Sequence, residues 1–209
     1  MMTRASTDVL IDRIPVSRNL ATDAIWVITF SLVTAICAQI SIHLPFSPVP
    51  ITGQTFAVLL SGAVLGWRRA FLSQVAYLAE GAAGLPVFAD GAGSVLHLLG
   101  PSGGFLLCFP LAAAMVGFLV EHGVARSTWK LVGALVTADV LILLAGSAWL
   151  RLLFRVPLAQ AWLLGFYPFL IADVVKVALV GGVLPRVVRR SGVGRQLSVV
   201  SRQSEVDEP

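Results

Sequence analysis

An aspartate and a lysine lie three residues apart in one apolar segment of this chain. Asp173 and Lys176 fall in the first half of residues 168–185, PFLIADVVKVALVGGVLP, which are long and apolar enough to cross a membrane. Residues three apart share one face of an α-helix, so the carboxylate and the ammonium can point into one pocket. Each charge costs roughly 2.5 to 3.5 kcal/mol near the centre of a membrane helix. The pair therefore predicts either a structural salt bridge or a site that binds a polar solute.

A proline-rich segment, residues 45–55, carries further polar groups. Three prolines within six positions predict a stiff, non-helical connection that presents Thr52, Gln54 and Thr55. At membrane depth such backbone is tolerated only where it is buried in protein or lines a cavity. The alternatives are a segment that lines a binding site and a plain surface loop.

A glycine-rich segment, residues 88–104, contains no Lys or Arg and predicts a flexible lid. Its histidine, His97, is either a ligand-binding residue or a bystander. The apolar segment before it contains Tyr77 and Glu80, and a later apolar segment contains Asp139 near its middle. Asp139 either belongs to a proton or ion path or pairs with a neighbouring helix.

The motifs of several enzyme classes are absent from the sequence. Only two lysines occur, Lys130 and Lys176, and neither stands in a phosphate loop ending in Gly-Lys-Ser/Thr. There is no HExxH zinc motif and no GxSxG nucleophile elbow, and Cys37 and Cys108 both fall inside apolar segments. We therefore expect transport or binding, with no metal and no cofactor, and with energy from a partner chain or an ion gradient.

Composition predicts the elements that must position these residues. Of 209 residues, 57% are hydrophobic and 12% are charged, against roughly 25% charged in soluble domains, and the mean hydropathy is +0.88. The apolar runs are continuous, so helices of about 20 residues are favoured over barrel strands. We predict an all-α membrane protein with six transmembrane helices, near residues 24–44, 54–67, 70–87, 105–120, 131–150 and 168–185.

Basic residues flank these apolar runs, which indicates membrane topology and not binding to nucleic acid. We divide the chain into a cytoplasmic leader (1–23), one six-helix domain (24–186) and a basic, disordered cytoplasmic tail (187–209). With both termini cytoplasmic, 12 of the 15 basic residues lie on the inner side. This orientation in the cell (inner) membrane places the proline-rich and glycine-rich segments outside, above Asp173 and Lys176.

The first predicted span carries small residues four apart, Ser31 with Ala35 and Thr34 with Ala38. This spacing lets two membrane helices approach closely. The face they form serves either packing inside the chain or contact with a partner protein.

Five stretches of the sequence together resemble a known family. They are PVPITGQTFAVLLSGAVLG from Pro48, YLAEGAAGLPVFADG from Tyr77, GPSGGFLLCF from Gly100, GSAWL from Gly146 and PFLIADVVK from Pro168. In this order they are similar to BioY, the biotin-specific substrate-binding subunit of energy-coupling factor (ECF) transporters, over roughly residues 40–184. The resemblance implies the six-helix fold of ECF substrate-binding (S) components and an outward-open site for biotin. It also implies partnership with a transmembrane coupling subunit and ABC-type ATPases.

The family's Asp-x-x-Lys motif maps onto Asp173 and Lys176. A carboxylate can accept a hydrogen bond from a ureido N–H of biotin, and an ammonium can donate to the ureido oxygen or to a carboxylate. The remaining residues of the expected site are Thr52, Gln54, Tyr77, Glu80, Phe88, His97, Gly103 and Gly104. The small residues Ser31, Thr34, Ala35 and Ala38 resemble the alanine motifs by which such subunits dock onto the coupling subunit.

The chain departs from the family pattern at Phe105, where a tyrosine is common, and at Asp139, in a span expected to be apolar. A function of another class also stays open. An ion- or proton-coupled carrier or channel could use Glu80, Asp139 and Asp173 as a relay.

Overall fold

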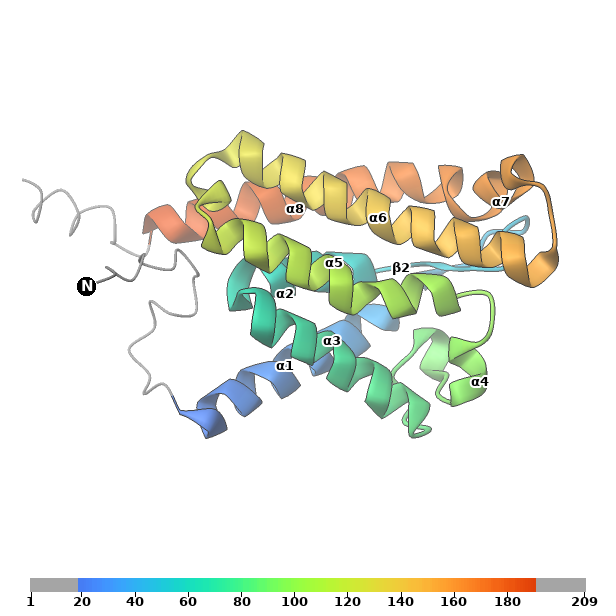
Figure 1. Ribbon diagram of the computed structural model, residues 1–209, viewed down its shortest axis with the longest axis horizontal. Coiled ribbons are helices and arrows are strands. Elements are labelled where there is room, and N and C mark those ends of the chain that lie inside the picture. Colours follow the sequence, from blue (N-terminus) through green and yellow to red (C-terminus); the bar gives the residue numbers. More distant parts are fainter. Residues whose placement is uncertain (1–18, 191–209) are drawn as a thin grey trace, which may run out of the picture.

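Six long helices contain most of residues 19–190, the part of the chain that the computed structural model describes. Figure 1 shows them as α1 (Leu20–Ala38), α2 (Gln54–Leu65), α3 (Trp67–Ala82), α5 (Gly103–Glu121), α6 (Thr128–Phe154) and α8 (Tyr167–Arg190). The predicted all-α fold with six principal helices is confirmed. Four stretches of the described residues are long and apolar enough to cross a membrane: Leu20–Ala38, Gly103–Glu121, Thr128–Phe154 and Leu158–Gly182. Helix α2 is apolar but shorter.

Several helix boundaries differ from those predicted. Helix α1 begins at Leu20, four residues early, because the Asn19 side chain accepts a hydrogen bond from the Thr22 backbone N–H (2.8 Å) and caps the first turn. Helices α2 and α3 are separated by Gly66, whose φ of +79° lies in a region that side chains disfavour. The break therefore precedes the two arginines that follow, which belong to α3.

At the other end of the domain, α8 continues to Arg190, so residues 187–190 are helical and not part of a disordered tail. The rest of the predicted tail, residues 191–209, lies outside the described residues, as do residues 1–18 of the predicted leader.

Short elements form the connections. The proline-rich segment is an extended hairpin, with β1 (Ser41–Ile42) antiparallel to β2 (Ile51–Thr52) and Ser41 opposite Thr52. The glycine-rich segment contains the 3-10 turn η2 (Ala89–Gly91) and the one-turn helix α4 (Val95–Leu98). A second 3-10 turn, η3 (Val124–Arg126), joins α5 to α6, and the short helix α7 (Leu158–Gly165) lies between α6 and α8.

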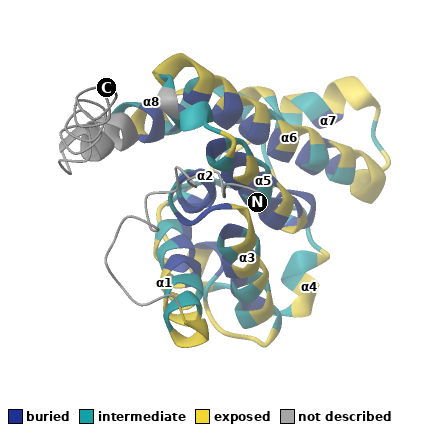
Figure 2. Cartoon of the chain, turned by 60° about the vertical axis from the view of Figure 1, so that its left-hand side comes forward, coloured by how far each residue is buried: buried dark blue, intermediate teal, exposed yellow. Residues whose placement is uncertain are grey.

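Helix α5 lies at the centre of the bundle, packed against α2, α3 and α6. Figure 2 shows α1 and α3 on one side of it and α6, α7 and α8 on the other. In the most apolar 18 residues of α5, 67% of the residues are buried, whereas the corresponding share in α1 is 22%. Helix α1 therefore has an outer face of large apolar side chains. The hairpin, α4 and α7 lie at one end of the bundle, and η3 and the start of α1 lie at the other (Figure 1). All the segments predicted to be outside therefore meet at one end.

Candidate functional site

A buried ion pair lies where α8 packs against α2. Lys176 Nζ donates to Asp173 Oδ1 (2.6 Å) and to Thr55 Oγ1 (2.8 Å), and Thr55 Oγ1 donates to the same Asp173 oxygen (3.3 Å). The Asp173 and Lys176 side chains are only 2% and 13% exposed. The two residues thus meet as their helical spacing predicts, and Thr55 at the start of α2 joins them. Asp173 Oδ2 is buried without a hydrogen-bond partner among the described residues.

The side chains of Thr55 and Lys176 reach a narrow cavity, here called the inner pocket. Its wall is formed by the hairpin, α2, the α4 region, α5, α6 and α8, through Val49, Pro50, Thr52, Gln54, Thr55, Ala89, His97, Ser102, Phe105, Leu106, Phe109, Leu143, Phe169 and Lys176. The wall combines a few polar groups with a mostly apolar surface, as small-molecule sites do. Its solvent-accessible volume is only about 30 Å³. A larger ligand must displace side chains to enter.

A wider cavity, here called the vestibule, adjoins the inner pocket at the loop end of the bundle. It has a solvent-accessible volume of about 460 Å³ and is lined by His43, Pro48, Pro50, Ala89, Asp90, Ser94, Leu96, His97, Gly100, Pro101 and Ser102. Pro50, Ala89, His97 and Ser102 belong to both cavities. These shared residues form the neck between the vestibule and the inner pocket.

His97 is held in this neck by an aromatic stack. Its ring lies 5.1 Å from that of Phe88, with the planes 19° apart. Partial burial lowers the pKa of His97 below its ordinary value, while the Asp90 carboxylate acts in the opposite direction. Asp90 also contacts His43, with 2.9 Å between its Oδ2 and the ring Nε2, and accepts a hydrogen bond from Ser41 (2.6 Å), which ties η2 to the hairpin. The predicted flexible lid is therefore partly structured and fastened to the other loop.

Three of the predicted polar residues, Thr52, Gln54 and Tyr77, form a chain of hydrogen bonds that begins at the pocket wall. Thr52 Oγ1 donates to Gln54 Oε1 (2.7 Å), the Gln54 amide donates to the Tyr77 hydroxyl, and that hydroxyl donates to the Val87 carbonyl (3.1 Å). Thr52 and Gln54 line the inner pocket. Tyr77 is fully buried behind them, so it orients Gln54 and does not form the pocket surface.

Phe88 also lies behind the pocket. It is fully buried, with its ring edge-to-face with Tyr77 and stacked under His97. Tyr77 and Phe88 thus support the residues that line the pocket, because the turn after α3 folds Phe88 back onto that helix.

Glu80 does not lie at either cavity. It accepts a hydrogen bond from Ser31 Oγ (2.6 Å), which joins α3 to α1. The structure therefore does not bring Glu80 together with Asp139 and Asp173, as an ion relay would require.

Gly103 and Gly104 begin α5 beside the pocket without lining it. A Cβ on Gly103 would lie 1.9 Å from the Leu98 carbonyl oxygen, and one on Gly104 would lie 2.2 Å from Trp149 Cβ. Trp149 also donates to the Gly100 carbonyl (2.9 Å). The structure thus gives both glycines a packing role, in which they let α5 and the α4 loop approach α6.

The predicted partner face of α1 needs correction. Ser31, Thr34 and Ala38 are fully buried and Ala35 is 8% exposed. Ser31 contacts Glu80, and Thr34 Oγ1 accepts a hydrogen bond from Gln74 (3.2 Å). The small residues are therefore used for close packing of α1 on α3, and this face is not accessible to another protein.

Three residues that are not among the expected biotin-binding residues lie at or beside the site. Thr55 stands in the sequence only as a polar group of the proline-rich segment, although it directly follows Gln54. Phe169 lines the pocket and precedes Asp173 and Lys176 by four and seven residues, a spacing that places all three on one helix face. Asp139 lies close enough to both members of the buried ion pair to interact with their charges, a proximity that no local pattern signals.

Comparison with known proteins connects this geometry to a family. A crystal structure titled as the S-component for biotin from an ECF-type ABC transporter aligns with a TM-score of 0.76 and 22% identity, covering 83% of this chain and 95% of that one. "Probable biotin transporter BioY" of Pyrococcus horikoshii is 41% identical over 71% of this chain and 85% of its own length. "Biotin transporter BioY2" of Lactococcus lactis subsp. cremoris is 36% identical over 72% of this chain and 82% of its own length. "Biotin transporter BioY" of Thermotoga maritima is 35% identical over 72% of this chain and 86% of its own length.

The chain thus has the same helical fold as that crystal structure, with an ion pair beneath a pocket at the loop end of the bundle. The BioY family model matches residues 4–192. The chain belongs to the BioY family.

Proposed function

We propose that this protein captures biotin at the outer face of the cell membrane, as the substrate-binding subunit of an ECF-type transporter. The observation that carries the proposal is the group formed by Asp173, Lys176 and Thr55, buried beneath an apolar pocket in a BioY-family chain. The names of the matched relatives and of the matched crystal structure support biotin as the substrate.

The polar end of the inner pocket suits a ligand that both donates and accepts hydrogen bonds. Lys176 supplies a charged donor at the pocket wall. Asp173 does not line the pocket itself but lies directly behind Lys176 and Thr55, and its Oδ2 is an acceptor with no hydrogen-bond partner among the described residues. A ureido group offers N–H donors and a carbonyl acceptor, which matches both. Because the ion pair compensates its own charge, a neutral polar group can bind there without bringing a counter-ion.

The apolar end of the pocket suits the rest of the ligand. Phe105, Phe109, Leu143 and Phe169 form a surface that can bury a thiophane ring and an alkyl chain. The vestibule above them, at about 460 Å³, lies in the size range of small-molecule sites. We propose that it admits the ligand, and that side chains at the neck move aside as the inner pocket widens.

The energy for uptake is proposed to come from partner subunits. The sequence has no phosphate loop, so ATP hydrolysis belongs to ABC-type ATPases that act through a transmembrane coupling subunit. The exposed face of α1, with Ile25, Ile28, Leu32 and Ile36, replaces the buried small residues as the part of α1 that can touch lipid or that subunit. The termini are proposed to be cytoplasmic.

Biotin titration of the purified protein in detergent tests the proposed substrate. The Thr55→Val variant keeps the shape of the side chain but removes a hydroxyl that contacts both charges. The hydroxyl positions the Lys176 ammonium at the pocket wall, and we expect a misplaced ammonium to lose its hydrogen bond to biotin. A hydrogen bond to a charged group is worth about 1.5 to 3 kcal/mol, so affinity should fall about ten- to a hundredfold. Thr137→Val is the matched control, because the Thr137 hydroxyl is exposed and bonds only the Gly133 carbonyl of its own helix. No binding of biotin by the wild-type protein, or equal losses in both variants, would contradict the proposal.

A further inference from the structure

A third ionisable side chain lies beside the buried ion pair. Asp139, near the middle of α6, is 5% exposed, and its Oδ1 is buried without a hydrogen-bond partner among the described residues. It does not line the inner pocket, although Leu143, one helical turn further along α6, does. Asp139 therefore lies behind the pocket wall. A charged carboxylate at such a place is destabilised unless a counter-charge or a proton compensates it.

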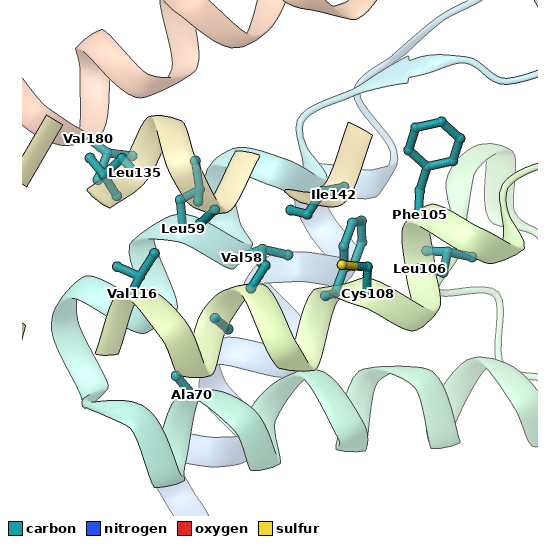
Figure 3. Close-up of a cluster of buried hydrophobic side chains, with 14 of the residues drawn as sticks. Val58, Leu59, Ala70, Phe105, Leu106, Cys108, Val116, Leu135, Ile142 and Val180 are labelled. Carbon is teal, nitrogen blue, oxygen red and sulfur yellow. The ribbon is translucent and has the colours of Figure 1, made fainter. Parts of the chain in front are cut away.

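The register between α6 and α8 places Asp139 level with Lys176. The two helices are antiparallel neighbours, and Figure 3 shows Leu135 of α6 beside Val180 of α8. Asp139 follows Leu135 by four residues along α6, toward the loop end of the bundle. Lys176 precedes Val180 by four residues along α8, which is the same distance in the same direction because the helices are antiparallel. Asp139 accordingly interacts with the charges of both Asp173 and Lys176.

Among the described side chains of the elements packed on α6, none except Lys176 places a cation near Asp139. Helix α8 brings Asp173 and Lys176, and α5 brings the Cys108 thiol, which contacts the Leu141 carbonyl (3.8 Å). Helices α2 and α7 contain no titratable side chain, and η3 packs on the start of α6, about three turns away. Two carboxylates and one ammonium thus share an apolar environment, which leaves one negative charge in excess.

A proton is the cation that suits this excess charge. A metal ion needs several oxygen, nitrogen or sulfur ligands, and the described residues contain no group of three His, Cys, Asp or Glu side chains able to hold one. The neighbours of Asp139 on the buried face of α6 are apolar: Leu135, Ala138 and Ile142. One proton on Asp139 makes the cluster neutral.

We propose that Asp139 is a positioning residue that binds a proton and thereby couples biotin affinity to pH; this inference rests on the proposed function. When Asp139 is neutral, the Lys176 ammonium interacts with Asp173 and with the ligand alone. An ionised Asp139 attracts the same ammonium and competes with the ligand for it. Biotin therefore binds more tightly to the form with a protonated Asp139, and binding takes up a proton wherever Asp139 is ionised in the free protein.

The expected signature is an affinity that falls as pH rises. For one linked proton the slope is at most about tenfold per pH unit. Between about pH 7 and pH 9 the carboxyl group of biotin stays ionised. His97 stays neutral in the same range, because its pKa is lowered by burial. Neither group therefore produces the expected slope.

Calorimetric titration of biotin into the purified protein, in buffers with different ionisation enthalpies, tests the proposal. Wild type should lose affinity across this range and take up a fraction of a proton per biotin at the alkaline end. Asp139→Asn should bind at all pH values about as tightly as wild type at the acidic end, with no proton uptake. Glu121→Gln makes the same chemical change at the opposite end of the bundle, where Glu121 accepts from the Trp67 backbone N–H, and should behave as wild type.

The outcomes separate this inference from the proposed function. Absence of biotin binding at every pH would overturn both. Tight binding by wild type with no pH dependence and no proton uptake would overturn the role of Asp139 alone, as would an Asp139→Asn variant that keeps the wild-type slope. The number of protons taken up per biotin is measured on the wild-type protein without any substitution. It therefore tests the role of Asp139 even if the Asp139→Asn variant does not fold.

Discussion

At the scale of single residues, Asp173 and Lys176 occupy positions where neither charge is tolerated without the other. Their side chains are 2% and 13% exposed, and their direct contact of 2.6 Å is reinforced by the Thr55 hydroxyl. Buried ion pairs also occur as purely structural contacts, without a ligand. Stability and ligand affinity, measured together, distinguish that role from binding.

Removing one member of the pair should destabilise the protein strongly. Lys176→Met leaves a buried carboxylate without its partner, at a cost of about 3 to 5 kcal/mol, whereas Asp173→Asn combined with Lys176→Met should recover most of that loss. The double variant should nevertheless bind biotin about ten- to a hundredfold more weakly or worse, since a charged donor and a charged acceptor are gone. Thermal melts in detergent beside biotin titrations measure both effects.

The exposed contact between His43 and Asp90 provides the control for stability. Its side chains are 63% and 50% exposed, and exposed pairs contribute only about 0 to 1 kcal/mol. His43→Gln should therefore change the melting temperature little. A double variant at Asp173 and Lys176 that keeps full biotin affinity would refute the binding role.

At the scale of elements, the close contact between α5 and α6 shapes one wall of the site. The absence of a side chain at Gly104 lets the start of α5 lie directly against Trp149, whose indole N–H donates to the α4 loop. This contact fixes where Ser102 and Phe105, on either side of the two glycines, meet the inner pocket. The glycine pair thus acts on the site through backbone position.

Replacing Gly104 by alanine should destabilise the protein. The new Cβ would lie 2.2 Å from Trp149 Cβ and 2.9 Å from the Ala145 carbonyl oxygen, so helices must separate, at a cost of about 1 to 3 kcal/mol. Gly133→Ala is the matched control on α6, because a Cβ there has no neighbour within 4 Å, and it should be neutral or stabilising by up to about 1 kcal/mol. Equal melting temperatures for the two variants would argue against the packing role.

At the scale of the whole molecule, polar loops collect at one end of the bundle and apolar helix faces surround the middle. The hairpin, α4 and α7 share the end at which the vestibule opens (Figure 1). The excess of basic residues on the opposite side predicts that the vestibule faces outward. Capture of an external solute requires this orientation.

Single cysteines test the orientation in intact cells. In a background in which Cys37 and Cys108 are replaced, Leu96→Cys on α4 should react with a membrane-impermeant thiol reagent added outside. His122→Cys, after α5 at the other end, should react only after the cells are opened. Both positions are exposed, so a difference in labelling reports the side of the membrane. The reverse pattern would overturn the outward-facing vestibule.

Part of this protein could be predicted from local properties of the sequence. Apolar runs of membrane length indicate a helical membrane protein, because helices satisfy their backbone hydrogen bonds within one segment. The spacing of Asp173 and Lys176 places both on one face, since three residues make nearly one turn. The prolines before Thr52 predict a non-helical connection, because proline lacks the backbone donor that a helix needs.

Tertiary structure alone decided which faces meet. The spacing of Ser31 and Ala35 suits a partner as well as a neighbouring helix, and only the rotation of α1 against α3 turned that face inward. Tyr77 and Phe88 lie behind the pocket and not in its wall, because the turn after α3 folds back on the helix. Asp139 lies level with Lys176 because of the register of α6 against α8. Rotation and register arise from side-chain packing between distant segments, which no single stretch of sequence contains.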